Sequence, residues 1–158
     1  MGKQGTKIAG LDVKDLIKDL NKAYCDEWLA YYSYWYMAKT VTGPGYEDMS
    51  EFLSKIAKDE EEHASELADR IQELGSLPIV HPMELEKNAN ASYPKPPKEL
   101  SDYKEIIKVV TDAEAGAIEV YNTLAAKTQG KDHATYQLVC HILEEEVKHE
   151  EMFEDLLE

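Results

Sequence analysis

Residues 53–67 read LSKIAKDEEEHASEL, and residues 139–153 read VCHILEEEVKHEEMF. In both stretches apolar side chains recur every three or four residues, which is typical of one face of an amphipathic α-helix. A glutamate and, three residues later, a histidine interrupt this face in each stretch. These two pairs are Glu60 with His63 and Glu146 with His149. The sequence therefore predicts two helices that carry the same polar pair within an apolar stripe.

Glycine and proline residues divide the rest of the chain into four helical segments. The breaks fall at Gly43-Pro44-Gly45, Gly75 and Gly130. The expected helix N-caps are Asp12, Ser101 and Asp132. The predicted helices cover residues 12–41, 46–75, 101–129 and 132–157. Residues 76–100 contain five prolines and are predicted to be a crossover loop with room for a short helix near 83–88. Residues 1–10 are expected to be a flexible tail of one domain covering 1–158.

Each predicted helix has one glutamate near the middle of its apolar stripe, which we call the seam. The four glutamates are Glu27, Glu60, Glu114 and Glu146. The first two are 33 residues apart and the last two 32, so the second hairpin repeats the first. Two short turns and one long link predict two antiparallel hairpins joined by a crossover. No run alternates in the manner of a β-strand, so the predicted fold is an all-α four-helix bundle.

Four carboxylates that converge in an apolar interior require compensation of their charge. Burying one carboxylate costs several kcal/mol, and like charges nearby increase this cost. No predicted seam position carries a Lys or Arg, so the glutamates would have to take up protons unless cations neutralise them. The sequence therefore predicts a site for two metal ions.

The types of ligand narrow the choice of metal. Four carboxylates and two imidazoles form an oxygen-rich set that suits iron, with manganese as an alternative. In the simplest arrangement Glu60 and Glu146 bridge the two ions, and Glu27 and Glu114 each bind one ion. The ligand set is completed by His63 and His149.

Two tyrosines are expected to support these ligands. Tyr34 follows Glu27 by seven residues, and Tyr121 follows Glu114 by seven, so each phenol can hydrogen-bond a ligand carboxylate. The remaining acidic neighbours are predicted to face solvent: Glu61, Glu62, Glu144, Glu145, Glu150 and Glu151. Three further histidines are expected at the surface or in loops: His81, His133 and His141. The two cysteines, Cys25 and Cys140, are expected to be small buried hydrophobes rather than ligands.

The composition argues against several classes of partner. A net charge of −15 repels nucleic-acid phosphates and anionic membrane surfaces and attracts cations. The most apolar window, residues 28–38, is too short to span a membrane.

Two cysteines without a Cys-x-x-Cys motif, and no signal-peptide pattern, favour a cytoplasmic protein. Outward aromatic side chains among residues 28–36 are expected at subunit contacts.

The six ligands and two tyrosines resemble the ferroxidase site of bacterioferritin. Residues 26–32, DEWLAYY, more closely resemble the Dps-like ferritins of archaea and anaerobic bacteria. This resemblance covers nearly the whole chain. It implies a hollow shell of twelve subunits that oxidises Fe(II), preferentially with hydrogen peroxide and otherwise with oxygen, and stores the ferric product inside. Such a protein limits oxidative stress.

The family pattern also has departures. Bacterioferritin binds haem through a methionine directly after the second-helix ligand, and Glu61 occupies that place here, so no haem is expected. Only nine residues follow His149, which favours twelve subunits over the 24-subunit ferritins with a fifth helix. Two alternatives remain open. One is a rubrerythrin-like di-iron peroxidase without storage, and the other is a bundle that binds metal only for stability.

Overall fold

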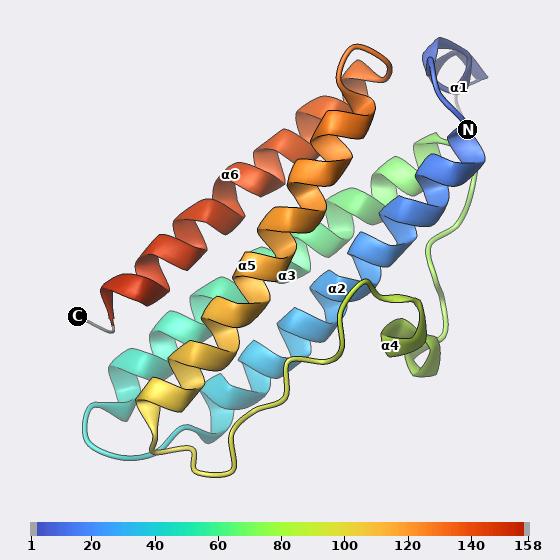
Figure 1. The fold of residues 1–158 in the computed structure, drawn as a ribbon. Helices are drawn as coiled ribbons and strands as arrows, with labels where there is room; N and C mark the ends of the chain where they lie inside the picture. Colours follow the sequence, from blue (N-terminus) through green and yellow to red (C-terminus); the bar gives the residue numbers. More distant parts are fainter. Residues whose placement is uncertain (1–2, 157–158) are drawn as a thin grey trace.

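The computed structural model describes residues 3–156, and the four expected long helices are all present. They are α2 (Val13–Thr40), α3 (Tyr46–Glu73), α5 (Tyr103–Thr128) and α6 (His133–Asp155). In Figure 1 they run side by side as two hairpins, α2 with α3 and α5 with α6. The hairpins pack through contacts of α2 with α5 and of α3 with α6. The prediction of an all-α four-helix bundle is confirmed.

The crossover and the N-terminal segment contain the remaining helices. The crossover includes a 3-10 turn, η1 (Pro82–Glu84), followed directly by α4 (Leu85–Asn88), close to the short helix expected there. It runs along the face formed by α2 and α5 (Figure 1). Within the expected tail, residues Lys3–Ile8 form the short helix α1, which has no buried residues. Residues 1 and 2 of the chain, and the predicted end of the last helix at residue 157, lie outside the described residues.

The helix ends follow local chemistry. Asp12 accepts hydrogen bonds from the backbone N–H groups of Lys14 (2.9 Å) and Asp15 (3.1 Å), as an N-cap should. Asp132 caps α6 in the same way. The prediction of Ser101 as the cap of α5 is wrong by one residue. Asp102 is the cap, because its carboxylate reaches the backbone N–H of Glu105 at 3.2 Å.

The bundle interior consists of two apolar clusters on either side of a polar middle layer. One cluster includes Met37, Leu53 and Phe153, and the other includes Leu20, Leu67 and Ile142. The predicted seam positions are largely those that the structure buries. Burial of these side chains supplies most of the stability of the bundle, and the two clusters enclose the polar middle layer between them.

One cation does lie on the continuation of a seam, contrary to expectation. Arg70 of α3 is buried, and its guanidinium donates to both carboxylate oxygens of Asp132, at 3.0 and 3.1 Å, and to Thr135 Oγ1 at 2.8 Å. This pair joins α3 to the start of α6. Arg70 Nη1 also donates to Glu73 at 2.7 Å. Because Arg70 is seven residues, or two helical turns, beyond His63, its charge serves Asp132 and Glu73 rather than the seam glutamates.

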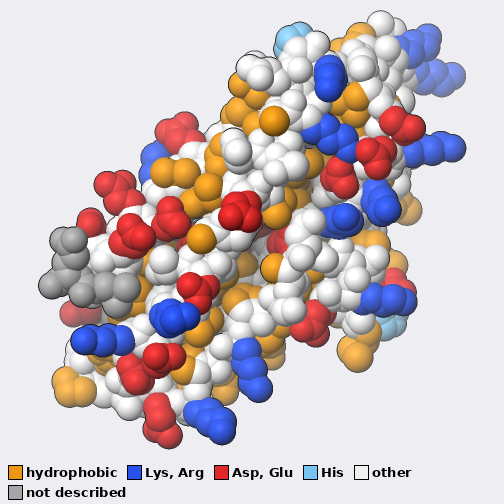
Figure 2. All heavy atoms as spheres, viewed as in Figure 1, with side chains coloured by type: hydrophobic (Ala, Val, Ile, Leu, Met, Phe, Trp, Pro, Cys, Tyr) orange, Lys and Arg blue, Asp and Glu red, His pale blue; other side chains and the backbone are white. Residues whose placement is uncertain are grey.

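Acidic side chains are abundant at the surface. Figure 2 shows them gathering along α6, in the same view as Figure 1. None of the described helices is long and apolar enough to cross a lipid bilayer.

Candidate metal centre

The six predicted ligands meet in the middle layer of the bundle. Each glutamate comes from a different helix and is at most 2% exposed, while His63 and His149 are 1% and 4% exposed. Their positions follow from the 3.6-residue period, which places a side chain and the one three residues later on the same helix face. The structure therefore brings together all six residues that the sequence singled out.

The ligand atoms form two overlapping groups. One consists of Glu27, Glu60, His63 and Glu146, and the other of Glu60, Glu114, Glu146 and His149. Within each group, one candidate ligand atom per residue lies within 4.8 Å of all the others. Glu60 and Glu146 belong to both groups. This arrangement suits two ions that share two carboxylates.

Both histidines turn Nδ1 toward the carboxylates. Nδ1 of His63 lies 3.0 Å from Glu146 Oε1, 3.6 Å from Glu27 Oε2 and 3.7 Å from Glu60 Oε2. Nδ1 of His149 lies 3.4 Å from Glu60 Oε1. The same nitrogen lies 3.4 Å from Glu114 Oε2 and 3.7 Å from Glu146 Oε2. Each imidazole can therefore offer the same nitrogen to an ion at its own end of the centre.

Several buried atoms of the centre have no partner with hydrogen-bond geometry among the described residues. They are Glu60 Oε1, His63 Nδ1, Glu114 Oε2, both carboxylate oxygens of Glu146, and His149 Nδ1. Buried polar atoms are nearly always satisfied, and an unsatisfied one costs about 1–3 kcal/mol. These atoms are electron-pair donors that point at a common centre, so the residues present fit a pair of metal ions.

The electrostatics of the metal-free centre also favour the binding of metal ions. Burial, followed by the charge of Glu60, raises the pKa of both Glu27 and Glu114 well above the ordinary value of 4.5. Burial alone would lower the pKa of His149, but Glu114, Glu146 and Glu60 outweigh it and raise the pKa to about 12. Without metal, the centre therefore holds protons in place of cations, and an ion that binds must displace them.

The two tyrosines form hydrogen bonds that cross between the hairpins. Tyr34 of α2 donates to Glu114 Oε1 of α5 at 2.7 Å, and Tyr121 of α5 donates to Glu27 Oε1 of α2. Burial, together with the nearby carboxylates, raises the pKa of both phenols, so they remain donors. Each bond leaves the other carboxylate oxygen free for a metal ion and restricts the orientation of the group.

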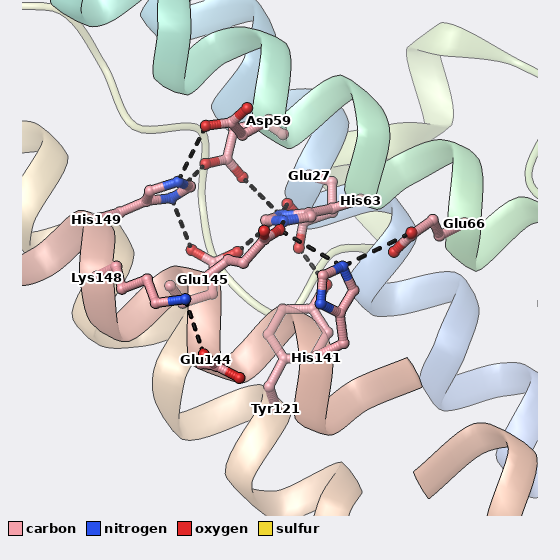
Figure 3. A network of polar contacts seen from close by, with 12 residues as sticks. Glu27, Asp59, His63, Glu66, Tyr121, His141, Glu144, Glu145, Lys148 and His149 are labelled. Carbon is pink, nitrogen blue, oxygen red and sulfur yellow. Dashed lines mark hydrogen bonds and ion pairs between the residues drawn. The ribbon is translucent and has the colours of Figure 1, made fainter. Parts of the chain in front are cut away.

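Two further carboxylates, which the sequence interpretation missed, hold the outer nitrogens of the histidines. Glu145 Oε2 lies 2.9 Å from His63 Nε2, and Asp59 Oδ2 lies 3.4 Å from His149 Nε2 (Figure 3). The side chain of Glu145 is still 37% exposed, so it faces solvent only in part, and it folds across the α3–α6 contact to reach His63. A signal was present: an acidic residue directly precedes the glutamate of each Glu-x-x-His pair.

The other residues considered as neighbours lie outside the ligand groups. Glu61, Glu62, Glu144 and Glu151 are exposed, and Glu150 is half-buried. His81 and His133 are exposed, as expected. His141 is also exposed and lies 3.7 Å from Glu145 Oε2 and 3.8 Å from Glu66 Oε1. Cys25 is buried, Cys140 is half-buried, and both are free thiols.

The ferritin-like domain family matches residues 17–158. The chain belongs to the ferritin-like family. This ferritin-like chain is 36% identical to the DNA protection during starvation protein of Pyrococcus furiosus, over 94% of the chain and 80% of that protein. It is 27% identical to the bacterial non-heme ferritin of Staphylococcus haemolyticus, over 89% of the chain and 80% of the ferritin.

A solved structure is similar to this ferritin-like chain over nearly its whole length. It is a dodecameric thioferritin, the bacterioferritin-related protein of Bacteroides fragilis. The two share 37% identity with a TM-score of 0.94, and the alignment covers 99% of this chain and 93% of the other. The four-helix arrangement is thus that of the ferritin-like family.

Proposed function

We propose that this protein oxidises Fe(II) at the centre and stores the ferric product, and that it thereby protects against peroxide. Two ferrous ions are oxidised per hydrogen peroxide: 2 Fe²⁺ + H₂O₂ + 2 H⁺ → 2 Fe³⁺ + 2 H₂O. With oxygen, the same two electrons reduce O₂ to H₂O₂. The observation that carries the proposal is the pair of overlapping ligand groups that share Glu60 and Glu146.

The ligand roles follow from the two groups. Two iron ions would share Glu60 and Glu146. Glu27 and His63 would complete the ligands of one ion, and Glu114 and His149 those of the other. All six residues are proposed ligands, and their bridged arrangement keeps two one-electron donors together for a two-electron oxidant. The carboxylates also favour the ferric product, because additional positive charge is stabilised by four anionic groups. Iron is the proposed metal, with manganese as an alternative, and no haem takes part.

The outer residues would hold the ligands in position. Glu145 accepts a hydrogen bond from His63 Nε2, and Asp59 lies 3.4 Å from His149 Nε2. These contacts direct each Nδ1 lone pair at an ion. Tyr34 and Tyr121 restrict the two terminal carboxylates. These residues support the reaction through the orientation of the ligands.

We also propose that the chain assembles into a hollow shell of twelve copies in the cytoplasm, as a store for ferric product requires an enclosed volume. The similar Bacteroides fragilis protein is dodecameric. Tyr32, Trp35 and Tyr36 of α2 are exposed aromatics suited to subunit contacts. A net charge of −15 argues against direct contact with nucleic acid. Twelve chains of 17.9 kDa would have a mass of about 215 kDa.

The decisive experiment is anaerobic loading of the metal-free protein with Fe(II), followed by hydrogen peroxide. We expect two ferrous ions per subunit, ferric absorbance on addition of peroxide, and two ions oxidised per peroxide. Glu60→Ala should abolish this stoichiometry, whereas Glu62→Ala, an exposed glutamate on the same helix, should preserve it. Metal binding without oxidation would favour the purely structural bundle. Rapid turnover with an external reductant in a small oligomer would favour the rubrerythrin-like peroxidase.

A further inference from the structure

A cavity of about 310 Å³ adjoins the centre between α2 and α5. The four seam glutamates all line it, so they form its inner end. Its side walls are mainly apolar and consist of Leu29, Ala30, Val109, Ala113, Ala117 and Val120. The ligand carboxylates can therefore be reached from this side through a passage with little polar surface.

The crossover forms the outer wall of this cavity. Ala91, Ser92 and Pro94 line it. This segment is held by Asp26, which accepts from the backbone N–H of Asn90 at 2.8 Å, from Asn90 Nδ2 at 2.6 Å and from the backbone N–H of Ala91 at 3.1 Å. Ser33 Oγ donates to the Pro94 carbonyl at 2.5 Å. The crossover is thus hydrogen-bonded to α2 at two places along the cavity.

Of the two acidic groups at the outer part of the cavity, Asp26 is bound to the crossover. Asp112 lies in an exposed pair with Lys108 at 2.7 Å, so it remains in solvent. A hydrated Fe(II) ion entering here would have to lose water along apolar walls before it met a free carboxylate, which is unfavourable. An uncharged molecule such as hydrogen peroxide or oxygen has a much smaller desolvation cost.

The opposite face of the bundle is polar. There Glu145, His141 and Glu66 extend from His63 toward the surface between α6 and α3 (Figure 3). Charged groups that can replace the water around a cation are therefore available on the α3–α6 side, and the apolar side walls are on the α2–α5 side.

The geometry points to the α2–α5 cavity as the chamber through which the uncharged oxidant reaches the iron centre. The crossover limits the size of the oxidant that can enter this chamber. This inference rests on the proposed function and assigns a substrate class to one side of the same site. Ferrous ions do not use this chamber.

Gly116 offers a direct test, because it lines the chamber on α5 and a Cβ built there meets nothing within 4 Å. Gly116→Leu should fold, since leucine has a higher helix propensity than glycine and the added side chain has open space. We expect the rate of Fe(II) oxidation by hydrogen peroxide to fall by at least about tenfold. The rate and stoichiometry of Co(II) binding, measured by visible absorption, should stay within about twofold.

The matched control is Ala115→Leu, which adds the same side chain at the neighbouring, exposed position of α5. Its oxidation rate should equal that of the wild type. If Gly116→Leu slows Co(II) binding as much as oxidation, the chamber is a route for cations and the inference is wrong. If oxidation is unchanged, the oxidant arrives elsewhere. Failure of the wild type to oxidise Fe(II) would instead overturn the proposed function.

Two measurements do not depend on how Gly116→Leu folds. Xenon under pressure should occupy the apolar chamber in crystals of the wild-type protein, and no xenon there would contradict access by small uncharged molecules. Asp26→Ala, which releases Asn90 and Ala91, should increase the rate with tert-butyl hydroperoxide relative to that with hydrogen peroxide by about threefold or more. An unchanged ratio would show that the crossover does not restrict the oxidant.

Discussion

The bundle buries carboxylates in two places, and it compensates their charge in two ways. Near the start of α6, Asp132 is 2% exposed, and both of its carboxylate oxygens accept from Nη2 of Arg70. In the middle layer, four glutamates converge, and several of their carboxylate oxygens lack hydrogen-bond partners among the described residues. The nearest basic groups are two imidazoles. The first carboxylate is neutralised by the chain itself. The second set is left for cations from outside, which is what separates a structural ion pair from a metal site.

The largest effect should come from breaking the internal pair. Arg70→Met would leave Asp132 buried without its cation, and we expect the free energy of unfolding of the metal-free protein to fall by about 3 kcal/mol. Urea denaturation at neutral pH measures this change. As a control, Lys108→Met removes the cation of an exposed pair with Asp112 and should have little effect. A loss no greater than that of the control would show that the buried pair does not stabilise the fold.

Removal of a shared carboxylate should affect metal binding rather than the free energy of unfolding. Glu146→Ala takes away a ligand that belongs to both groups, so we expect loss of both ions and a reduction in affinity of at least about 100-fold. Metal analysis after reconstitution with Fe(II) or Co(II) gives the result. Glu151→Ala, at an exposed position of the same helix, is the control and should retain two ions. Full occupancy in Glu146→Ala would contradict the shared role.

A smaller effect, of opposite sign to that of Arg70→Met, is expected when a carboxylate of the centre is made neutral. Glu114→Gln should raise the free energy of unfolding of the metal-free protein by about 1 kcal/mol, because an amide cannot become a buried anion. Glu119→Gln, on the exposed side of α5, is the matched control. Destabilisation by Glu114→Gln would mean that the attraction between Glu114 and His149 outweighs the cost of burying the carboxylate.

The same comparison predicts opposite pH dependence for the two places. The folded-state pKa of Glu114 lies above 4.5, so its contribution to metal-free stability is lost as pH rises from 4.5 toward the raised value. Burial would raise the pKa of Asp132, but Thr135 and Arg70 outweigh it and lower the pKa below 3.8. Its contribution is therefore present above 3.8 and is lost as pH falls through the lowered value. Denaturation measured across pH gives the free energy of unfolding as a function of pH. This free energy should depend less on pH above 4.5 in Glu114→Gln, and less on pH below 3.8 in Asp132→Asn.

The smallest effects should distinguish the two ends of the centre. Glu145 approaches its histidine more closely than Asp59 does, 2.9 Å against 3.4 Å. We expect Glu145→Gln to lower the affinity for one ion by about tenfold, and Asp59→Asn to have a smaller effect on the other. Co(II) titration can resolve two such steps. Equal effects would show that the outer carboxylates contribute equally despite the difference in distance.

Much of the centre could be predicted because its ligands repeat a local pattern. Each Glu-x-x-His pair lies on one helix, and each tyrosine lies seven residues after a glutamate. These relations depend only on the helical period. Glu145 and Asp59 were missed because both directly precede seam residues and a helical wheel places them outside the seam. Their side chains reach the histidines only because α3 and α6 are close.

The sequence alone determined the four amphipathic helices, their order and the six residues at the middle of the seams, because periodicity and residue type are local properties of the chain. The tertiary structure decided which groups pair across helices: Tyr34 with Glu114, Tyr121 with Glu27, and Arg70 with Asp132. It also placed the crossover along the apolar cavity beside the centre. Such contacts depend on the relative register of packed helices and on the reach of each side chain, and neither is contained in the period of a single helix.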